Sequence, residues 1–198
     1  MHKIFDTVID SFIENKIGIA EDFLDKELAA GLKKNLLSLY TGSQLKPART
    51  GNAVIPLQDK TVRSDIIYWL DRTHENAAEE AFFDLMDRFV AYLNSSCFTG
   101  ITGYEFHYTM YEKGSFYKKH LDQFRNNESR QFSMIMYLNE DWLEKDGGEL
   151  RIHPMGKPSE TISPLYGKSV FFRSNELEHE VLISNKERMS ITGWLKIG

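Results

Sequence analysis

Two histidines and one aspartate in the second half of the sequence could together bind a divalent metal ion. His120 and Asp122 are two positions apart in a predicted strand, so both side chains leave the same face. His179 lies far along the chain, at the start of another apolar strand, where an antiparallel fold can return it beside the first pair. Two imidazoles and one carboxylate form the facial triad of non-haem Fe(II) sites, which leaves positions open for oxygen chemistry. By itself this spacing also fits surface or hydrogen-bonding histidines.

A second polar group follows the third candidate ligand. Arg188 comes nine positions after His179, and Ser190 shares its face of a predicted strand. A guanidinium binds a carboxylate through two parallel hydrogen bonds, and a serine hydroxyl can add a third. The pair therefore suits a dicarboxylate beside the metal, although a strand arginine is in general more often found in a salt bridge at a sheet rim.

The elements that must position these residues divide the chain into two parts. Apolar residues recur at helical spacing over about 4–13, 28–39 and 78–93. Asp25 is a plausible N-cap of the second helix, and Gly42 is a plausible stop. These apolar stripes indicate core packing against a sheet.

From Tyr104 onward, short aromatic and β-branched runs alternate with turn residues. They predict strands near 104–111, 115–121, 131–139, 149–153, 168–173, 179–184 and 188–196. Many short strands with no helix between them favour an antiparallel sandwich or barrel, with the early helices packed on one sheet. We therefore expect an α+β fold in a single domain over 1–198, with a helical part over about 1–97 and a β core over about 98–198.

Composition narrows the classes of function. The formal net charge of -5 gives no basic surface for a phosphate backbone, so nucleic acid is not the expected partner. The single cysteine, Cys97, excludes an intrachain disulfide framework and fits a reducing cytoplasm. We expect neither a signal peptide nor a transmembrane span, because no segment approaches about 18 uninterrupted apolar residues. The sequence gives no indication of an oligomeric state.

A longer motif surrounds the candidate ligands. It reads Tyr111-x-x-Gly114-x-x-Tyr117-x-x-His120-x-Asp122, then Tyr137-Leu138-Asn139, Gly147-Gly148-x-Leu150, His179 and Arg188. This pattern resembles the prolyl 4-hydroxylase group of 2-oxoglutarate oxygenases. Two further segments, Arg63-x-Asp65-x-x-x-Trp69 and Asn139-x-Asp141-Trp142, resemble the hypoxia-sensing prolyl hydroxylases and their bacterial counterparts.

The resemblance implies a double-stranded β-helix, or jelly roll, that binds Fe(II) between its sheets. It implies that 2-oxoglutarate chelates the iron, that its far carboxylate meets Arg188 with a hydrogen bond from Tyr137, and that Leu150 and Trp194 wall the pocket. Tyr111 would lie near the co-substrate. O2 would be the oxidant, succinate and CO2 the products, and ascorbate a candidate reductant.

The same resemblance implies a loop that closes over the substrate. Arg63, Asp65 and Trp69 match this loop, and Tyr117 matches a residue at the edge of the site. The polar stretch after the ligand pair ends at Arg130, and in the resembled enzymes residues at the positions of Asp65 and Arg130 pair. We therefore expect an Asp65–Arg130 ion pair that ties the loop to the core.

Three functions remain open at this point. The first is hydroxylation of a prolyl residue in a protein partner, which the bacterial relatives suggest could be a translation factor such as elongation factor Tu, or a ribosomal protein. The second is oxidation of a free amino acid or another small molecule. The third is a jelly-roll module that binds metal or ligand without turnover, which the presence of Arg188 disfavours.

Overall fold

The computed structural model describes residues 2–48, 60–123 and 128–198. Its helices are α1 (His2–Asn15), α2 (Lys26–Thr41) and α3 (Ala77–Cys97), with short 3-10 turns at Arg72–His74 and Glu144–Asp146. Its strands are β1 (Ile17–Ala20), β2 (Lys46–Pro47), β3 (Ile66–Trp69), β4 (Gly103–Tyr111), β5 (Tyr117–His120), β6 (Arg130–Tyr137), β7 (Leu150–His153), β8 (Glu160–Ile162), β9 (Ser169–Arg173), β10 (Glu178–Val181) and β11 (Arg188–Lys196). None of the helices in these ranges is long and apolar enough to cross a membrane.

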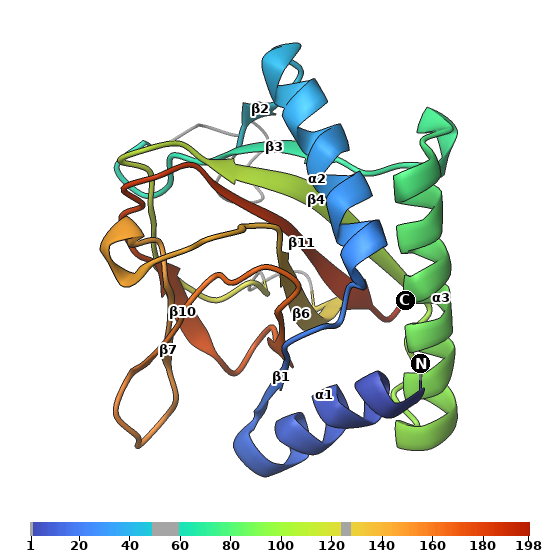
Figure 1. The fold of residues 1–198 in the computed structure, drawn as a ribbon. Helices are drawn as coiled ribbons and strands as arrows, with labels where there is room; N and C mark the ends of the chain where they lie inside the picture. Colours follow the sequence, from blue (N-terminus) through green and yellow to red (C-terminus); the bar gives the residue numbers. More distant parts are fainter. Residues whose placement is uncertain (1, 49–59, 124–127) are drawn as a thin grey trace.

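The strands form two antiparallel sheets. The larger has the order β1-β9-β6-β11-β4-β3-β2, and the smaller has the order β5-β10-β7-β8. Figure 1 shows the three helices gathered on one side of the larger sheet, with β7 and β10 on the other side. This is the expected jelly-roll arrangement, with the N-terminal helices packed on one sheet.

Side chains that alternate along the strands of the larger sheet belong to two hydrophobic cores, one on each face of the sheet. In β6, Met134 and Met136 pack with helix residues such as Phe89, whereas Ile135 and Tyr137 pack with residues of the smaller sheet. Successive side chains of a strand point to opposite faces, so one sheet can support a structural core on one side and a site on the other.

The helix ends confirm the expected capping residues. The Asp25 carboxylate accepts a hydrogen bond from the Leu28 backbone N–H at 2.8 Å, and Gly42 is the C-cap of α2. The Asn76 side chain accepts from the backbone N–H groups of Ala78 and Glu79 at the start of α3. Side-chain caps satisfy donors that have no partner within the helix.

Three features of the fold differ from the expectation. The first hundred residues were expected to be mainly helical, but they also supply β1, β2 and β3, which pair with strands of the larger sheet or with one another. β8 was likewise not expected. In addition, β5 ends at His120, so Asp122 lies beyond the strand that was expected to contain it.

Candidate metal centre and co-substrate pocket

The three expected metal ligands meet at one point. One ligand atom from each of His120, Asp122 and His179 lies within 4.8 Å of the others. His120 Nε2 is 3.4 Å from Asp122 Oδ1, and His179 Nε2 is 3.6 Å from Asp122 Oδ2. All three side chains are largely buried. Two imidazoles and one carboxylate in this arrangement suit Fe(II).

Strand pairing explains how residues 59 positions apart come together. His179 on β10 is the register partner of His120 on β5, and their ring centroids are 4.3 Å apart. Each ring then uses Nδ1 for a backbone carbonyl, since His120 Nδ1 lies 2.8 Å from the Lys118 oxygen and His179 Nδ1 lies 3.0 Å from the Leu177 oxygen. A carbonyl only accepts, so Nδ1 carries the proton and Nε2 keeps its lone pair for a metal.

The charge states of the buried ligands also suit a metal. Burial lowers the pKa of His179 to about 4, although the nearby Asp122 opposes this shift. Burial alone would raise the pKa of Asp122, but the proximity of His179 and His120 and the hydrogen bond from Ser133 bring it well below its usual range. At neutral pH the histidine is therefore neutral and the carboxylate ionised, which is the state that binds metal.

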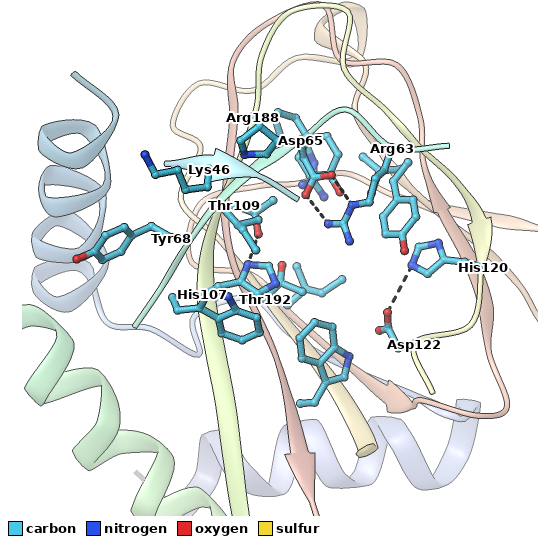
Figure 2. A pocket seen from close by; sticks show the side chains of 18 of the residues that line it. Lys46, Arg63, Asp65, Tyr68, His107, Thr109, His120, Asp122, Arg188 and Thr192 are labelled. Atoms are coloured by element: carbon cyan, nitrogen blue, oxygen red, sulfur yellow. Dashed lines mark hydrogen bonds and ion pairs between the residues drawn. The ribbon is translucent and has the colours of Figure 1, made fainter. Parts of the chain in front are cut away.

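Arg188 lies at the inner end of the same pocket. It is 1% exposed, its Nε donates to the Gly148 carbonyl at 2.8 Å, and its Nη1 lies 3.5 Å from the Ser190 hydroxyl. Its guanidinium carbon is 4.9 Å from the ring centre of Tyr111 and 5.0 Å from that of Tyr137. Figure 2 shows Arg188 on the opposite side of the pocket from His120 and Asp122.

Three buried donors around this pocket have no acceptor among the described residues. They are Arg188 Nη2, the Tyr137 hydroxyl and Trp194 Nε1. Burial raises the pKa of Tyr137, so its phenol keeps the proton that it would donate. Buried polar groups are nearly always hydrogen-bonded, and an anionic ligand with carboxylate oxygens would satisfy them. The residues present therefore fit both Fe(II) and 2-oxoglutarate.

The pocket has a volume of about 730 Å³ and brings together most of the expected site residues. Those that line it are His120, Asp122, His179, Arg188, Tyr111, Leu150, Trp194, Arg63, Asp65, Trp69, Arg130 and Tyr117. Tyr137 and Ser190 are not among the lining residues, but both are buried beside Arg188.

The expected loop residues lie at the side of the pocket near His120. The Tyr117 ring stacks on the His120 ring with 3.6 Å between centroids. The guanidinium carbon of Arg63 lies over the Tyr117 ring, 4.2 Å from its centroid. Arg63 and Tyr117 are also paired by a β-bridge. Trp69 is 46% exposed, so it offers an open aromatic surface at the mouth.

The expected Asp65–Arg130 ion pair is not present among the described residues, and each side chain has another partner. Asp65 is fully buried and accepts two hydrogen bonds from Arg63, at 2.8 and 2.6 Å. Arg130 donates to Glu105 at 3.0 and 2.8 Å, and its guanidinium lies 3.4 Å from the centre of the Trp194 ring. Residues 124–127 of the polar stretch before Arg130 lie outside the described residues.

Sequence reasoning missed several lining residues that alternation could have found. His107 and Thr109 precede Tyr111 by four and two positions on β4, and Thr192 follows Arg188 by four on β11. Side chains at even spacing on a strand share a face, so these residues had to join the pocket. The mouth residues from β2 and β3 carried no such signal; they are Lys46, Pro47, Ile67 and Tyr68.

The fold and the site together define a jelly-roll oxygenase of the non-haem Fe(II) class. The model of the 2OG-Fe(II) oxygenase superfamily matches residues 106–196. A prolyl-4-hydroxylase from Pseudomonas putida is 31% identical with a TM-score of 0.88, and the alignment covers 98% of this chain and 99% of that one. The chain belongs to the 2OG-Fe(II) oxygenase superfamily, in its prolyl hydroxylase group.

Other relatives agree with this assignment. The human protein Egl nine homolog 1 is 30% identical over 206 residues, which cover 91% of this chain and 44% of the human one. The hypoxia-inducible factor prolyl hydroxylase of Caenorhabditis elegans is 28% identical over 202 residues, which cover 96% of this chain and 28% of the nematode one. This chain thus spans less than half the length of these curated relatives. A Trichoplax adhaerens prolyl hydroxylase supports the fold. It is 22% identical with a TM-score of 0.87, and the alignment covers 98% of this chain and 89% of that one.

Proposed function

We propose that this chain uses Fe(II), 2-oxoglutarate and O2 to hydroxylate a prolyl residue in a protein substrate. The observation that carries the proposal is the group of three buried donors that have no acceptor among the described residues and lie in or beside the pocket that contains the metal ligands. The likeness to the P. putida prolyl-4-hydroxylase, over nearly the whole of both chains, supports the prolyl substrate.

His120, Asp122 and His179 would hold the iron. Iron bound there supplies the coupled oxidation in which O2 converts 2-oxoglutarate to succinate and CO2 and gives its second oxygen atom to a substrate C–H bond. The chain itself supplies position and charge. Both histidines are fixed through Nδ1 by backbone carbonyls, which keeps each Nε2 directed at the ion.

Arg188 and Tyr137 would orient the co-substrate. Arg188 has one terminal nitrogen available, Tyr137 has a protonated hydroxyl, and both are buried at the inner end of the pocket. A carboxylate that accepts from both donors is fixed in position and is kept out of water. Leu150, Ile135 and Val181 line the pocket with apolar surface that protects the reacting groups from solvent.

A substrate peptide would approach from the mouth. The pocket extends from the metal ligands to Trp69, Tyr68 and Lys46, and Trp69 is only half buried. A prolyl side chain carries aliphatic C–H groups that pack well on an aromatic surface, and the half-exposed Trp69 offers such a surface at the mouth.

The proposal can be tested in cell lysate. Purified protein with Fe(II) and 2-oxoglutarate should add 16 Da to a proline of a specific protein, as detected by peptide mass spectrometry. The Asp122→Ala variant is the matched control and should add none. Oxidation of free proline or of another metabolite, with no protein modified, would support the small-molecule alternative and contradict the proposal.

Several finer points form part of the same proposal. A translation factor such as elongation factor Tu is the substrate that the identified peptide should come from, and ascorbate should sustain turnover by keeping iron reduced. We also propose that the helices and the sheets form one oxygenase domain, because one core contains residues of α1, α2, α3 and the larger sheet. The free thiol of Cys97 supports a cytoplasmic location.

A further inference from the structure

Asp122 needs an anchor that the sheet does not provide. β5 ends at His120, so Asp122 has no strand partner to fix its backbone, yet its carboxylate is 9% exposed and must face the metal. The two histidine ligands lie within strands and are fixed by backbone carbonyls. Something else must therefore hold the third ligand.

Two buried serines supply this anchor, Ser133 on β6 and Ser174 directly after the end of β9. The Ser133 hydroxyl donates to Asp122 Oδ2 at 2.6 Å, and Ser133 Oγ lies 2.9 Å from Ser174 Oγ. Both serines are fully buried. An ionised carboxylate only accepts, so the single proton of Ser133 goes to Asp122, and Ser174 must then donate to Ser133. The hydrogen bonds run in one direction, from Ser174 to Ser133 to Asp122, and each strengthens the next.

Ser174 also holds the backbone beside the ligand. Its carbonyl accepts from the Gln123 N–H at 3.1 Å, and its own N–H donates to the Gln131 carbonyl at 3.1 Å. Gln123 directly follows Asp122, so Ser174 holds the backbone beside Asp122 directly and holds the Asp122 carboxylate through Ser133. The main chain and the side chain of Ser174 together replace the missing strand partner.

We propose that Ser133 and Ser174 are positioning residues that make Asp122 a ligand through one oxygen. Each carboxylate oxygen lies near one imidazole, with Oδ1 3.4 Å from His120 Nε2 and Oδ2 3.6 Å from His179 Nε2, but only Oδ2 accepts from the serine, so Oδ1 is the oxygen that would bind iron. A carboxylate that bound through both oxygens would fill a fourth position on the ion. Binding through one oxygen would keep that position open for 2-oxoglutarate and O2. The inference rests on the metal centre and not on the identity of the substrate.

Metal affinity tests this role without any substrate. Ser133→Thr keeps the hydroxyl and adds a methyl group. Ser133→Val has the shape of the threonine variant but no hydroxyl, so any effect of added bulk is common to both variants. We expect Ser133→Val to bind Co(II) about 10- to 100-fold more weakly than Ser133→Thr, the usual scale for groups that orient metal ligands. In the cobalt-loaded protein, the d–d absorption change on adding 2-oxoglutarate should need several-fold more of it in Ser133→Val.

Equal Co(II) affinity of the Thr and Val variants would overturn the positioning role. Equal response of their cobalt spectra to 2-oxoglutarate would overturn the assignment of a single bound oxygen. If Ser133→Val does not fold, Ser174→Ala replaces it, and this variant should weaken Co(II) binding by a smaller factor than the loss of the Ser133 hydroxyl. Ser174→Ala with unchanged affinity would exclude the two-serine arrangement.

Ser169→Ala is the matched control. Ser169 is a fully buried serine at the start of β9, the strand that Ser174 directly follows, and its hydroxyl donates to the Ala20 carbonyl rather than to a ligand. Its replacement should leave Co(II) affinity unchanged, and a loss as large as that of Ser133→Val would show that the effect is general loosening of the sheet. A failure to hydroxylate any peptide would count against the proposed function alone, since these measurements use no peptide.

Discussion

Truncation of Arg188 to alanine should weaken binding of 2-oxoglutarate by a predictable amount. In the described structure the buried Arg188 guanidinium has one terminal nitrogen without an acceptor, next to a Tyr137 hydroxyl without one. Removing one partner of a buried, hydrogen-bonded charge pair costs about 2–5 kcal/mol. Since about 1.4 kcal/mol is a factor of ten, the dissociation constant should rise by roughly 30-fold to several thousand-fold.

Two further variants divide this effect between the donors. Tyr137→Phe removes one hydrogen bond to a charged group, which contributes about 1.5–3 kcal/mol, so we expect a rise of roughly 10- to 100-fold. Arg188→Lys keeps the charge but loses the bond from Nε to the Gly148 carbonyl and the planar fork, so its loss should be intermediate. Arg151→Ala is the control, because Arg151 is a half-exposed arginine of the smaller sheet.

Calorimetry on the cobalt-loaded proteins without O2 measures these constants, and thermal unfolding gives an independent reading. At a concentration 100 times the dissociation constant, a ligand stabilises the folded state by about 2.7 kcal/mol. For a chain of this size that raises Tm by roughly 5–10 °C. Arg188→Ala should lose most of this rise. If Arg188→Ala and Tyr137→Phe bind 2-oxoglutarate as tightly as Arg151→Ala, the anchor lies elsewhere.

Three other variants test separate parts of the site. Asp122→Ala should abolish both iron binding and turnover, and wild-type turnover with iron bound would refute the ligand assignment. Burial, with the charge of Arg63 adding to it, lowers the pKa of His107 to about 4. The unfolded chain binds that proton near pH 6.5, so stability should fall as pH drops from about 6.5 to 4, and His107→Leu should reduce the slope of the unfolding free energy by up to about 1.4 kcal/mol per pH unit. Gly148→Ala should cost about 1–3 kcal/mol of stability, measured by denaturant unfolding, because Gly148 has φ +68°. It should also weaken 2-oxoglutarate binding, measured by calorimetry, because a Cβ there would lie 3.0 Å from Arg188 Cδ.

The sequence predicted that the candidate metal ligands and Arg188 lie together because local rules determine their placement. Even spacing along β11 puts Arg188 and Ser190 on one face, and an antiparallel return places His179 opposite His120. The three candidate ligands meet at one point even though Asp122 lies beyond the strand. In that case two serines distant in sequence, rather than the strand, set the direction of the carboxylate.

Partner choice among charged side chains could not be predicted in this way. Asp65 was expected to pair with Arg130, but Arg63 lies two residues away on the same side and fills both carboxylate oxygens. Arg130 instead meets Glu105 and Trp194, which are register partners on β4 and β11. The contacts of Arg130 with Glu105 and Trp194 depend on the register of β4 and β11, and that register is determined only when the whole sheet forms.

The helices determine the site without contacting it, because they fix the register of β11. Met189, Ile191 and Leu195 are buried in the core that faces the helices, whereas Arg188 and Trp194, at the alternate positions of β11, face the pocket. A shift of one residue would turn the apolar set towards the pocket and the site residues towards the helices. The cost of exposing three large apolar side chains, about 1.5–3 kcal/mol each, opposes such a shift. The packing of α1, α2 and α3 on the far face of the sheet is therefore what keeps Arg188 and Trp194 directed into the pocket that contains the candidate metal ligands.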